Sequence, residues 1–304
     1  MRLPARLVAR CKRIVKQPTF RKVVLFGAGL IGGSFALALR KADAVGEVVG
    51  FGRSAATLQQ AQQLGIIDRI GDDVAAEVHN ADLVLLATPV GQMAELMARI
   101  APHLGRHTLV TDGGSTKGDV VAAASANLGD KISQFVPAHP IAGAEKSGAA
   151  AANADLYQGK RVVLTPLPEN SQDAVARVRL AWESCGAIVS ELTPEQHDTV
   201  FAAVSHLPHL LSFALVHDLA QRDNRDQLLS FAASGFRDFT RIAASSPEMW
   251  RDICMANRDA LLRELQQYSA ELDVLHHALE NNDAAKLQEI FSLAREVRSA
   301  WTQQ

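Results

Sequence analysis

The stretch Gly27-Ala28-Gly29-Leu30-Ile31-Gly32 lies between the apolar run Val23–Phe26 and a helical pattern that begins at Phe35. Three glycines at this spacing, between a strand and a helix, are typical of a dinucleotide-binding unit. Gly27 permits the tight turn, Gly29 lets the backbone approach a pyrophosphate, and Gly32 allows close packing of helix on strand. The N–H groups at the helix amino end, around Leu30 and Ile31, would bind the phosphates. The sequence therefore predicts a Rossmann-type domain.

The first two-thirds of the chain alternates short β-branched runs with helical patterns, which indicates a parallel sheet covered by helices on both faces. After Glu191 the strand patterns stop, and Thr193-Pro194-Glu195-Gln196 is typical of a capped helix start. We expect a doubly wound parallel sheet over residues 21–191, followed by an all-α substrate and dimerisation domain over 192–304. The expected strands are 22–26, 47–51, 83–88, 108–111, 135–138, 162–165 and 187–191.

Composition bounds the class of protein. A chain of 304 residues, 48% hydrophobic and 21% charged, is long enough for two ordinary globular domains. A net charge of −2 gives no reason to expect nucleic acid or an acidic membrane surface as a partner. We also expect no membrane span, because no apolar run approaches the roughly twenty residues that a bilayer requires. The scattered Cys11, Cys185 and Cys254 favour a reduced, cytoplasmic protein without disulfides.

The amino-terminal residues 1–20 differ from the rest of the chain. The first twenty-two residues contain eight Arg or Lys and no acid, and Arg2, Arg6, Arg10 and Arg13 recur at helical spacing. We interpret this segment as a basic extension ahead of the first strand. An organellar presequence is the alternative.

The helical region carries a long apolar seam. Ser246-Pro247-Glu248 is typical of a helix start. In the helix that follows, apolar residues recur at intervals of four and three, which is an a/d pattern. We predict a homodimer through this region, with packing inside the same domain as the alternative. The seam residues are Leu261, Leu265, Tyr268, Leu272, Leu275 and Leu279.

The end of the second predicted strand bears on the choice of nucleotide. An acidic residue there would bind the ribose 2′-hydroxyl and favour NAD. This chain has Gly52, Arg53 and Ser54 instead, and a guanidinium suits a 2′-phosphate. We therefore expect NADP to be preferred and NAD to be possible; alternatively, Arg53 is a solvated surface residue and both cofactors work. Thr88, the last residue of the expected strand 83–88, and Pro89 after it lie where the chain commonly passes the nicotinamide ribose.

Two further turns carry chemistry. Asp112-Gly113-Gly114-Ser115-Thr116-Lys117 follows a strand and leads into a helix, so Ser115 is either a helix cap or part of a ligand site. His139 follows the apolar run 135–138 and precedes Glu145 in a glycine-punctuated loop. Histidine ordinarily titrates near pH 6.5, which suits a proton acceptor in hydride transfer. A structural histidine bonded to backbone is the alternative.

Polar side chains in the helical region suggest a substrate pocket. His197, His206 and His209 lie in its first stretch, where Pro208 should kink the helix. The spacing of His206 and His209 also suits a metal, but no nearby acid or cysteine completes a ligand set, so we expect none. Arg237 and Arg241 stand among aromatic residues in the segment 231–243, too few for tracking nucleic acid phosphates.

Taken together, these motifs resemble the prephenate/arogenate (cyclohexadienyl) dehydrogenase family from about residue 21 to about residue 260. The resemblance implies NAD(P)-dependent oxidative decarboxylation of prephenate to 4-hydroxyphenylpyruvate, or of arogenate to tyrosine, in tyrosine biosynthesis. It implies that His139 accepts the ring hydroxyl proton beside Ser115 and that Arg241 holds the ring carboxylate. It places His209 at the substrate side chain. The resemblance also assigns His197 and His206 to the pocket, Glu145 to a gating or orienting position, and Arg237 to a basic position.

Two other functions stay open from the residues alone. Another two-domain NAD(P)-dependent hydroxyacid dehydrogenase would need a catalytic lysine on a central helix and would leave the loop 139–148 unexplained. A redox sensor would bind NADP without turning it over, and the polar set Ser115, His139 and Arg241 argues against it. A single turnover assay would distinguish the redox sensor from an enzyme.

Overall fold

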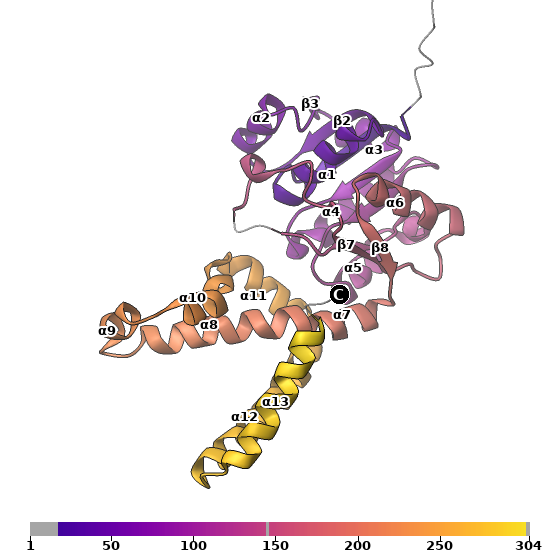
Figure 1. The fold of residues 1–304 in the computed structure, drawn as a ribbon. Coiled ribbons are helices and arrows are strands. Elements are labelled where there is room, and N and C mark those ends of the chain that lie inside the picture. Colours follow the sequence, from indigo (N-terminus) through magenta and orange to yellow (C-terminus); the bar gives the residue numbers. More distant parts are fainter. Residues whose placement is uncertain (1–17, 144–145, 302–304) are drawn as a thin grey trace, which may run out of the picture. The chain divides into compact units, whose positions relative to one another are not determined.

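The computed structural model describes residues 18–143 and 146–301. The chain forms two compact units (Figure 1). The first runs to Thr88 and includes Gln92–Gly114 and Ala123–Glu191; the second comprises Pro89–Gly91, Ser115–Ala122 and the chain from Leu192 onward. Most of the predicted basic extension, residues 1–17, and the predicted site residue Glu145 lie outside the described residues.

A five-stranded parallel sheet forms the centre of the first unit, in the order β3-β2-β1-β4-β5. This confirms the predicted doubly wound parallel fold. Strand order reverses between β1 and β4, which is where such sheets bind ligands. The strands are β1 (Phe20–Phe26), β2 (Val45–Phe51), β3 (Arg69–Ile70), β4 (Leu83–Leu86) and β5 (Leu109–Asp112). The helices of this region are α1 (Leu30–Lys41), α2 (Ala55–Gln63), α3 (Val74–His79), α4 (Met93–Ile100), α5 (Gly118–Asn127) and α6 (Gln172–Ser184).

A second sheet corrects the predicted position of His139. It contains β6 (Ala138–Pro140), β7 (Arg161–Leu164) and β8 (Ile188–Glu191), with β6 antiparallel to β7 and β7 parallel to β8. The predicted strand 135–138 is wrong: Phe135 makes only an isolated bridge to Val110. Pro137 follows this bridge and has no N–H with which to extend a ladder. His139 therefore lies inside a strand, opposite Val163, and not beyond its carboxyl end.

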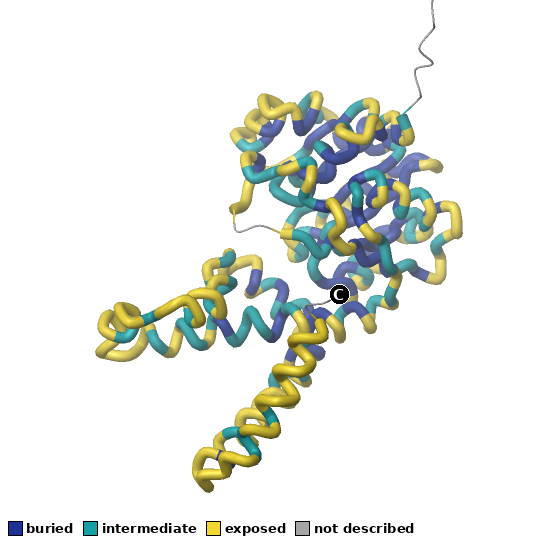
Figure 2. Tube along the Cα trace, viewed as in Figure 1, coloured by how far each residue is buried: buried dark blue, intermediate teal, exposed yellow. Residues whose placement is uncertain are grey.

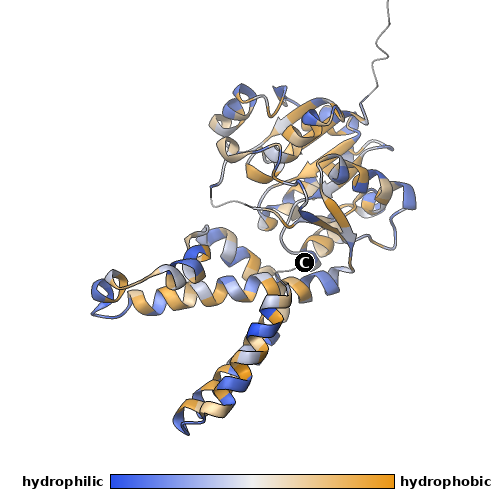
Figure 3. Cartoon of the chain, in the orientation of Figure 1, coloured by the Kyte–Doolittle hydropathy of each residue, from blue (hydrophilic) through white to orange (hydrophobic). Residues whose placement is uncertain are grey.

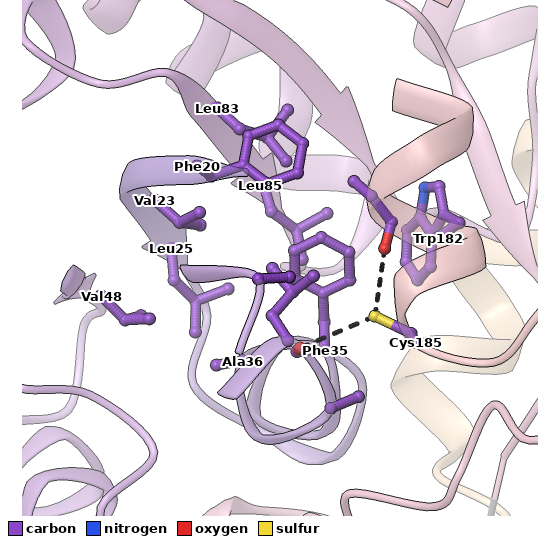
Figure 4. Close-up of a cluster of buried hydrophobic side chains, with 14 of the residues drawn as sticks. Phe20, Val23, Leu25, Phe35, Ala36, Val48, Leu83, Leu85, Trp182 and Cys185 are labelled. Carbon is purple, nitrogen blue, oxygen red and sulfur yellow. Dashed lines mark hydrogen bonds between the residues drawn. The ribbon is translucent and has the colours of Figure 1, made fainter. Parts of the chain in front are cut away.

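The core of the first unit holds α1 firmly (Figure 4). Trp182 of α6 is fully buried, and its ring meets Phe35 of α1 edge-on, with centroids 4.7 Å apart. The Cys185 thiol donates to the carbonyl oxygens of Ala181 and Phe35, and burial raises its pKa well above the usual value. These contacts fix the helix whose amino end carries the glycine motif.

Local capping rules account for two helix starts of the second unit. Thr193 Oγ1 accepts from the Gln196 backbone N–H at 3.2 Å, while Gln196 Oε1 accepts from the Thr193 N–H at 3.0 Å, which confirms the predicted capping box. Ser246 Oγ accepts from the Met249 N–H, which confirms the second predicted start. The helices are α7 (Pro194–Phe201), α8 (Leu207–Ala220), α9 (Arg225–Ser230), α10 (Ser234–Thr240), α11 (Pro247–Ala256), α12 (Arg258–Glu280) and α13 (Ala284–Trp301).

A π-helical segment, Ala202–His206, joins α7 to α8. Pro208 at the start of α8 cannot donate a backbone hydrogen bond, which explains why the helical ladder changes its spacing here. The stretch Pro194–Ala220 is nevertheless long and apolar enough to cross a membrane, and its most apolar 18-residue window has a mean hydropathy of 1.6. Our expectation that no apolar run approaches this length does not hold for it. This finding rests on the length and the composition of the helix alone.

The helix α12, which carries the apolar seam, is mostly exposed (Figure 2), although hydrophobic residues recur along it (Figure 3). The predicted single helix after Ser246 is broken at Asn257 into α11 and α12. Leu261 at the start of α12 is buried, but Leu272 and Leu279 are 47% and 64% exposed. Every residue of α13, all of them described, keeps some exposure. Three of the six seam residues, Tyr268, Leu272 and Leu279, are therefore exposed, while Leu265 and Leu275 are half-buried.

Candidate active site

The glycine turn between β1 and α1 leaves an open, donor-rich helix end. Gly27 has φ +98°, and a Cβ there would lie 2.4 Å from the Ala87 carbonyl oxygen. A Cβ on Gly32 would lie 2.2 Å from the Gly27 oxygen, so only glycine permits this packing. At Gly29 a Cβ would meet nothing within 4 Å, and no side chain caps α1 there. The N–H groups of its first turn thus have no side-chain cap, and such a helix start is suited to binding a phosphate.

Two further positions fit a nucleotide. After β2 the chain continues with the exposed Gly52, Arg53 and Ser54, and Ser54 Oγ accepts from the Thr57 N–H to cap α2. The Ser54 hydroxyl proton and the Arg53 guanidinium can still donate to a ligand. After β4, the Thr88 hydroxyl is buried without a hydrogen-bond partner among the described residues. An orphaned buried hydroxyl at this edge fits a polar group of a bound cofactor.

Asp112, at the end of β5, connects the two predicted catalytic turns. It is fully buried; Oδ1 accepts from the Ala138 N–H at 2.9 Å and Oδ2 from the Gly114 N–H at 2.8 Å. These donors directly precede His139 and Ser115, which are both partly buried. We did not predict this role. The sequence feature that could have indicated it is an acidic residue at the end of a predicted strand, within the motif that also contains Ser115.

Hydrogen-bond partners assign the tautomers of three histidines in the second unit. His197 Nδ1 lies 2.8 Å from Asp198 Oδ1, and His209 Nδ1 lies 2.9 Å from the Ser205 carbonyl oxygen. Both partners accept, so each Nδ1 carries the proton. His206 Nδ1 instead lies 3.0 Å from Asn257 Nδ2, which donates. The neutral His206 ring therefore carries its proton on Nε2, the opposite arrangement.

Burial makes two of these rings poor bases. Burial lowers the pKa of His206 to about 4. The negative charge of Asp198 raises this pKa, but by less than burial lowers it. Burial and the positive charge of Arg241 lower the pKa of His209. The His209 ring stacks on Trp250 with centroids 3.6 Å apart. Near neutral pH these side chains therefore act as hydrogen-bonding groups and not as cations.

The predicted site residues fall into groups within the two units. His206 is buried against Asn257, His197 is buried against Phe201 beside Asp198, and His209 lies partly exposed against Trp250. Arg241 follows α10 and acts electrostatically on His209, and Arg237, one turn earlier, is exposed. The Trp250 indole N–H is buried without a partner among the described residues, a donor that a ligand would satisfy.

Possible metal ligands gather away from these histidines. Among the residues described, the group that places its ligand atoms close together is His276, His277 and Glu280, exposed on α12. His206 and His209 do not belong to it, and the prediction that the site needs no metal stays a prediction.

A glycine turn at the amino end of α1, beside the point where strand order reverses, defines a dinucleotide-binding domain of the Rossmann class. Residues 35–191 match the family model for the nucleotide-binding domain of prephenate dehydrogenase, and residues 193–293 match that for its dimerization domain. The chain therefore belongs to the prephenate dehydrogenase family. The glycine motif precedes the matched residues, so its assignment rests on its geometry.

Similar proteins agree with this assignment. The chain is 39% identical to prephenate dehydrogenase of Bacillus subtilis (strain 168) over 91% of this chain and 75% of that protein. It is 34% identical to a prephenate dehydrogenase from A. aeolicus, solved with hydroxyphenyl propionate and NAD+, with a TM-score of 0.86 over 92% and 98% of the two chains. Synechocystis arogenate dehydrogenase shares 30% identity, with a TM-score of 0.78 over 92% and 99%.

Proposed function

We propose that this chain catalyses the NAD(P)-dependent oxidative decarboxylation of prephenate or arogenate in tyrosine biosynthesis. The observation that carries the proposal is the match of both units, in order, to the two domains of the prephenate dehydrogenase family. The glycine turn and the group of buried and half-buried histidines supply sites for a nucleotide and a polar ring substrate.

The reaction asks the protein to move one proton and to hold the substrate. A bound nicotinamide would supply the hydride acceptor for ring C4. His139 accepts the proton of the 4-hydroxyl, so that C4 becomes a carbonyl carbon. The bond to the ring carboxylate then breaks, its electron pair passes through the ring to the carbonyl oxygen, and the proton returns to give a phenol. Because aromatisation drives the loss of carbon dioxide, orientation is the protein's main contribution.

The remaining predicted residues would orient the substrate. In this proposal Ser115 binds the ring hydroxyl and Arg241 the ring carboxylate, since a guanidinium suits a carboxylate. His209 binds the side chain, and its neutral ring offers Nε2 as an acceptor. His206 offers the opposite, an Nε2–H donor. His197, Glu145 and Arg237 complete the predicted set.

We propose that NADP is used at least as efficiently as NAD. The exposed Arg53 and Ser54 follow β2 where an acid would repel a 2′-phosphate. The similar A. aeolicus enzyme was solved with NAD+, which supports use of a nicotinamide nucleotide without separating the two.

A homodimer fits the dimerization-domain match and the exposed apolar seam on α12. A second copy would also cover the apolar stretch Pro194–Ala220, of whose most apolar window only 28% is buried. We propose a cytoplasmic enzyme whose partners are its small-molecule substrate and its own second copy, with neither nucleic acid nor membrane.

Initial rates in a two-by-two grid test the proposal directly. Prephenate and arogenate are each assayed with NAD and with NADP, following reduced nucleotide and carbon dioxide. Turnover of either substrate with release of carbon dioxide supports the function, and no turnover in all four combinations contradicts it. A strong preference for NAD contradicts the nucleotide assignment alone.

A further inference from the structure

The carboxylate of Asp198 on α7 gathers hydrogen bonds from two parts of the second unit. Oδ1 accepts from the Lys117 backbone N–H at 2.9 Å and from His197 Nδ1 at 2.8 Å, while Oδ2 accepts from the Gly118 N–H at 2.8 Å. The Asp198 side chain is only 14% exposed. Both of its oxygens are therefore committed to neighbours.

Two of these donors lie at the amino end of α5. N–H groups at a helix start lack partners within the helix, and a negative charge there is favoured by the helix dipole. The acceptor usually comes from the residue just before the helix, but here it comes from α7, about eighty residues later. A Cβ on Gly118 would lie 2.9 Å from Asp198 Oδ2, so glycine leaves room for the bond. Asp198 thereby fixes the backbone that follows Ser115.

The third donor sets the state of His197. Burial disfavours the charge on Asp198, but the hydrogen bonds from His197 and from the backbone of Lys117 and Gly118 hold its pKa below the usual value. An ionised carboxylate can only accept, so the proton of the neutral His197 ring lies on Nδ1. Nε2 is then the acceptor, in a ring that is fully buried against Phe201.

A backbone contact extends the link to His206. The Asp198 carbonyl oxygen accepts from Asn257 Nδ2 at 2.7 Å, and the same amide group donates to His206 Nδ1. Asn257 lies at the break between α11 and α12. One residue of α7 thus connects the Ser115 segment, His197 and His206.

We propose that Asp198 is a positioning residue of the dehydrogenase reaction. It holds the backbone between Ser115 and α5 and keeps the proton of the buried His197 ring on Nδ1, without touching the substrate itself. This inference rests on the proposed function, because that function is what makes Ser115 a substrate-binding group.

Asp198→Asn tests the proposal, with Glu195→Gln as the matched control. Both substitutions remove one negative charge from α7, and Glu195 is exposed. We expect Asp198→Asn to lower kcat/KM for the cyclohexadienyl substrate by about ten- to a hundred-fold, the usual effect of misplacing a positioned group. The KM for the nucleotide should change by less than about two-fold, as should all constants of the control. Unchanged kcat/KM in folded Asp198→Asn overturns the proposal.

A spectroscopic measurement does not depend on the variant folding or on activity. Nitrogen-15 spectra of ring-labelled wild-type protein should show the proton on Nδ1 in neutral His197 and on Nε2 in His206. Finding it on Nε2 in His197 overturns the proposal. In folded Asp198→Asn the His197 proton should redistribute toward Nε2. If wild-type protein turns over neither substrate, the proposed function fails. The ring spectra still decide whether Asp198 sets the position of the proton on the His197 ring.

Discussion

The carboxylate of Asp112 accepts a hydrogen bond from the backbone N–H of Ala138, 2.9 Å away, although 26 residues separate them. Its other oxygen accepts from Gly114 at 2.8 Å. A single buried side chain thus fixes the residue before His139 and the residue before Ser115. His139, the proposed base, and Ser115 therefore each follow a residue whose backbone N–H is held by the same carboxylate.

Asp112→Asn should weaken the fold measurably. An amide keeps one acceptor oxygen but turns an NH₂ group toward the other backbone donor, which leaves a buried N–H unsatisfied. Such a loss costs about 1–3 kcal/mol in the free energy of unfolding. Urea unfolding of the variant measures it, with the exposed Asp130→Asn as control. A variant as stable as wild type would show that the two bonds contribute little.

His139→Asn should remove the proposed base while keeping a polar side chain of similar reach. The expected loss is about 10²–10⁴-fold in kcat, the usual contribution of a positioned general base. Substrate binding should change much less. In wild type, activity should fall toward acid pH as the proton acceptor becomes protonated, and this acid limb should vanish in the variant. If His139→Asn keeps both the wild-type kcat and the acid limb of the pH profile, His139 does not act in the mechanism.

Arg241→Ala should raise KM for the substrate, because the ring carboxylate is charged before and during the reaction. Leaving a bound carboxylate unpaired typically costs about 2–5 kcal/mol. Steady-state kinetics measure the change, with Arg251→Ala on α11 as an exposed control. A near-normal KM in the folded variant means that another residue holds the carboxylate.

Arg53→Ala should discriminate between the two nucleotides. If the guanidinium binds the 2′-phosphate, its loss removes a charge-assisted contact of about 1.5–3 kcal/mol for NADP and leaves NAD nearly unaffected. KM values for both nucleotides in wild type and variant provide the test. Equal losses for NADP and NAD would contradict the assignment.

The buried His206 should make the fold sensitive to acid. Its pKa is lowered to about 4, so between roughly pH 6.5 and 4 the unfolded chain binds a proton that the folded chain excludes. The free energy of unfolding should therefore fall as the pH drops through this window, by at most about 3 kcal/mol. Urea unfolding across the window measures the slope. His206→Gln should flatten it, and an unchanged slope would mean that other groups dominate.

The features that the sequence predicted depend on neighbours along the chain. The glycine turn at Gly27, the capping box at Thr193 and the helix start at Ser246 each follow from residues within one or two turns. The alternation of strands and helices was likewise enough for the parallel sheet. These signals require no knowledge of which distant segments meet.

The features that were missed depend on distant segments. The antiparallel pairing of β6 with β7 puts His139 inside a strand, and nothing local to residues 135–140 specifies that partner. The bonds of Asp198 to α5 cross about eighty residues, and those of Asn257 to Asp198 and His206 cross more than fifty. An acid beside a histidine is a weak pattern, so only the folded geometry singles out Asp198. The roles of the site residues themselves stay predictions.

The exposure of α13 has a consequence for how the molecule assembles. The helices α12 and α13 keep apolar side chains in water, so packing against each other stabilises them only a little. Their folding should therefore be coupled to association with a second copy. Stability measured at low protein concentration should then be smaller than at high concentration. Recovery of the helical unit from denaturant should include a bimolecular step, while the parallel sheet, with its own core, refolds at a rate independent of dilution.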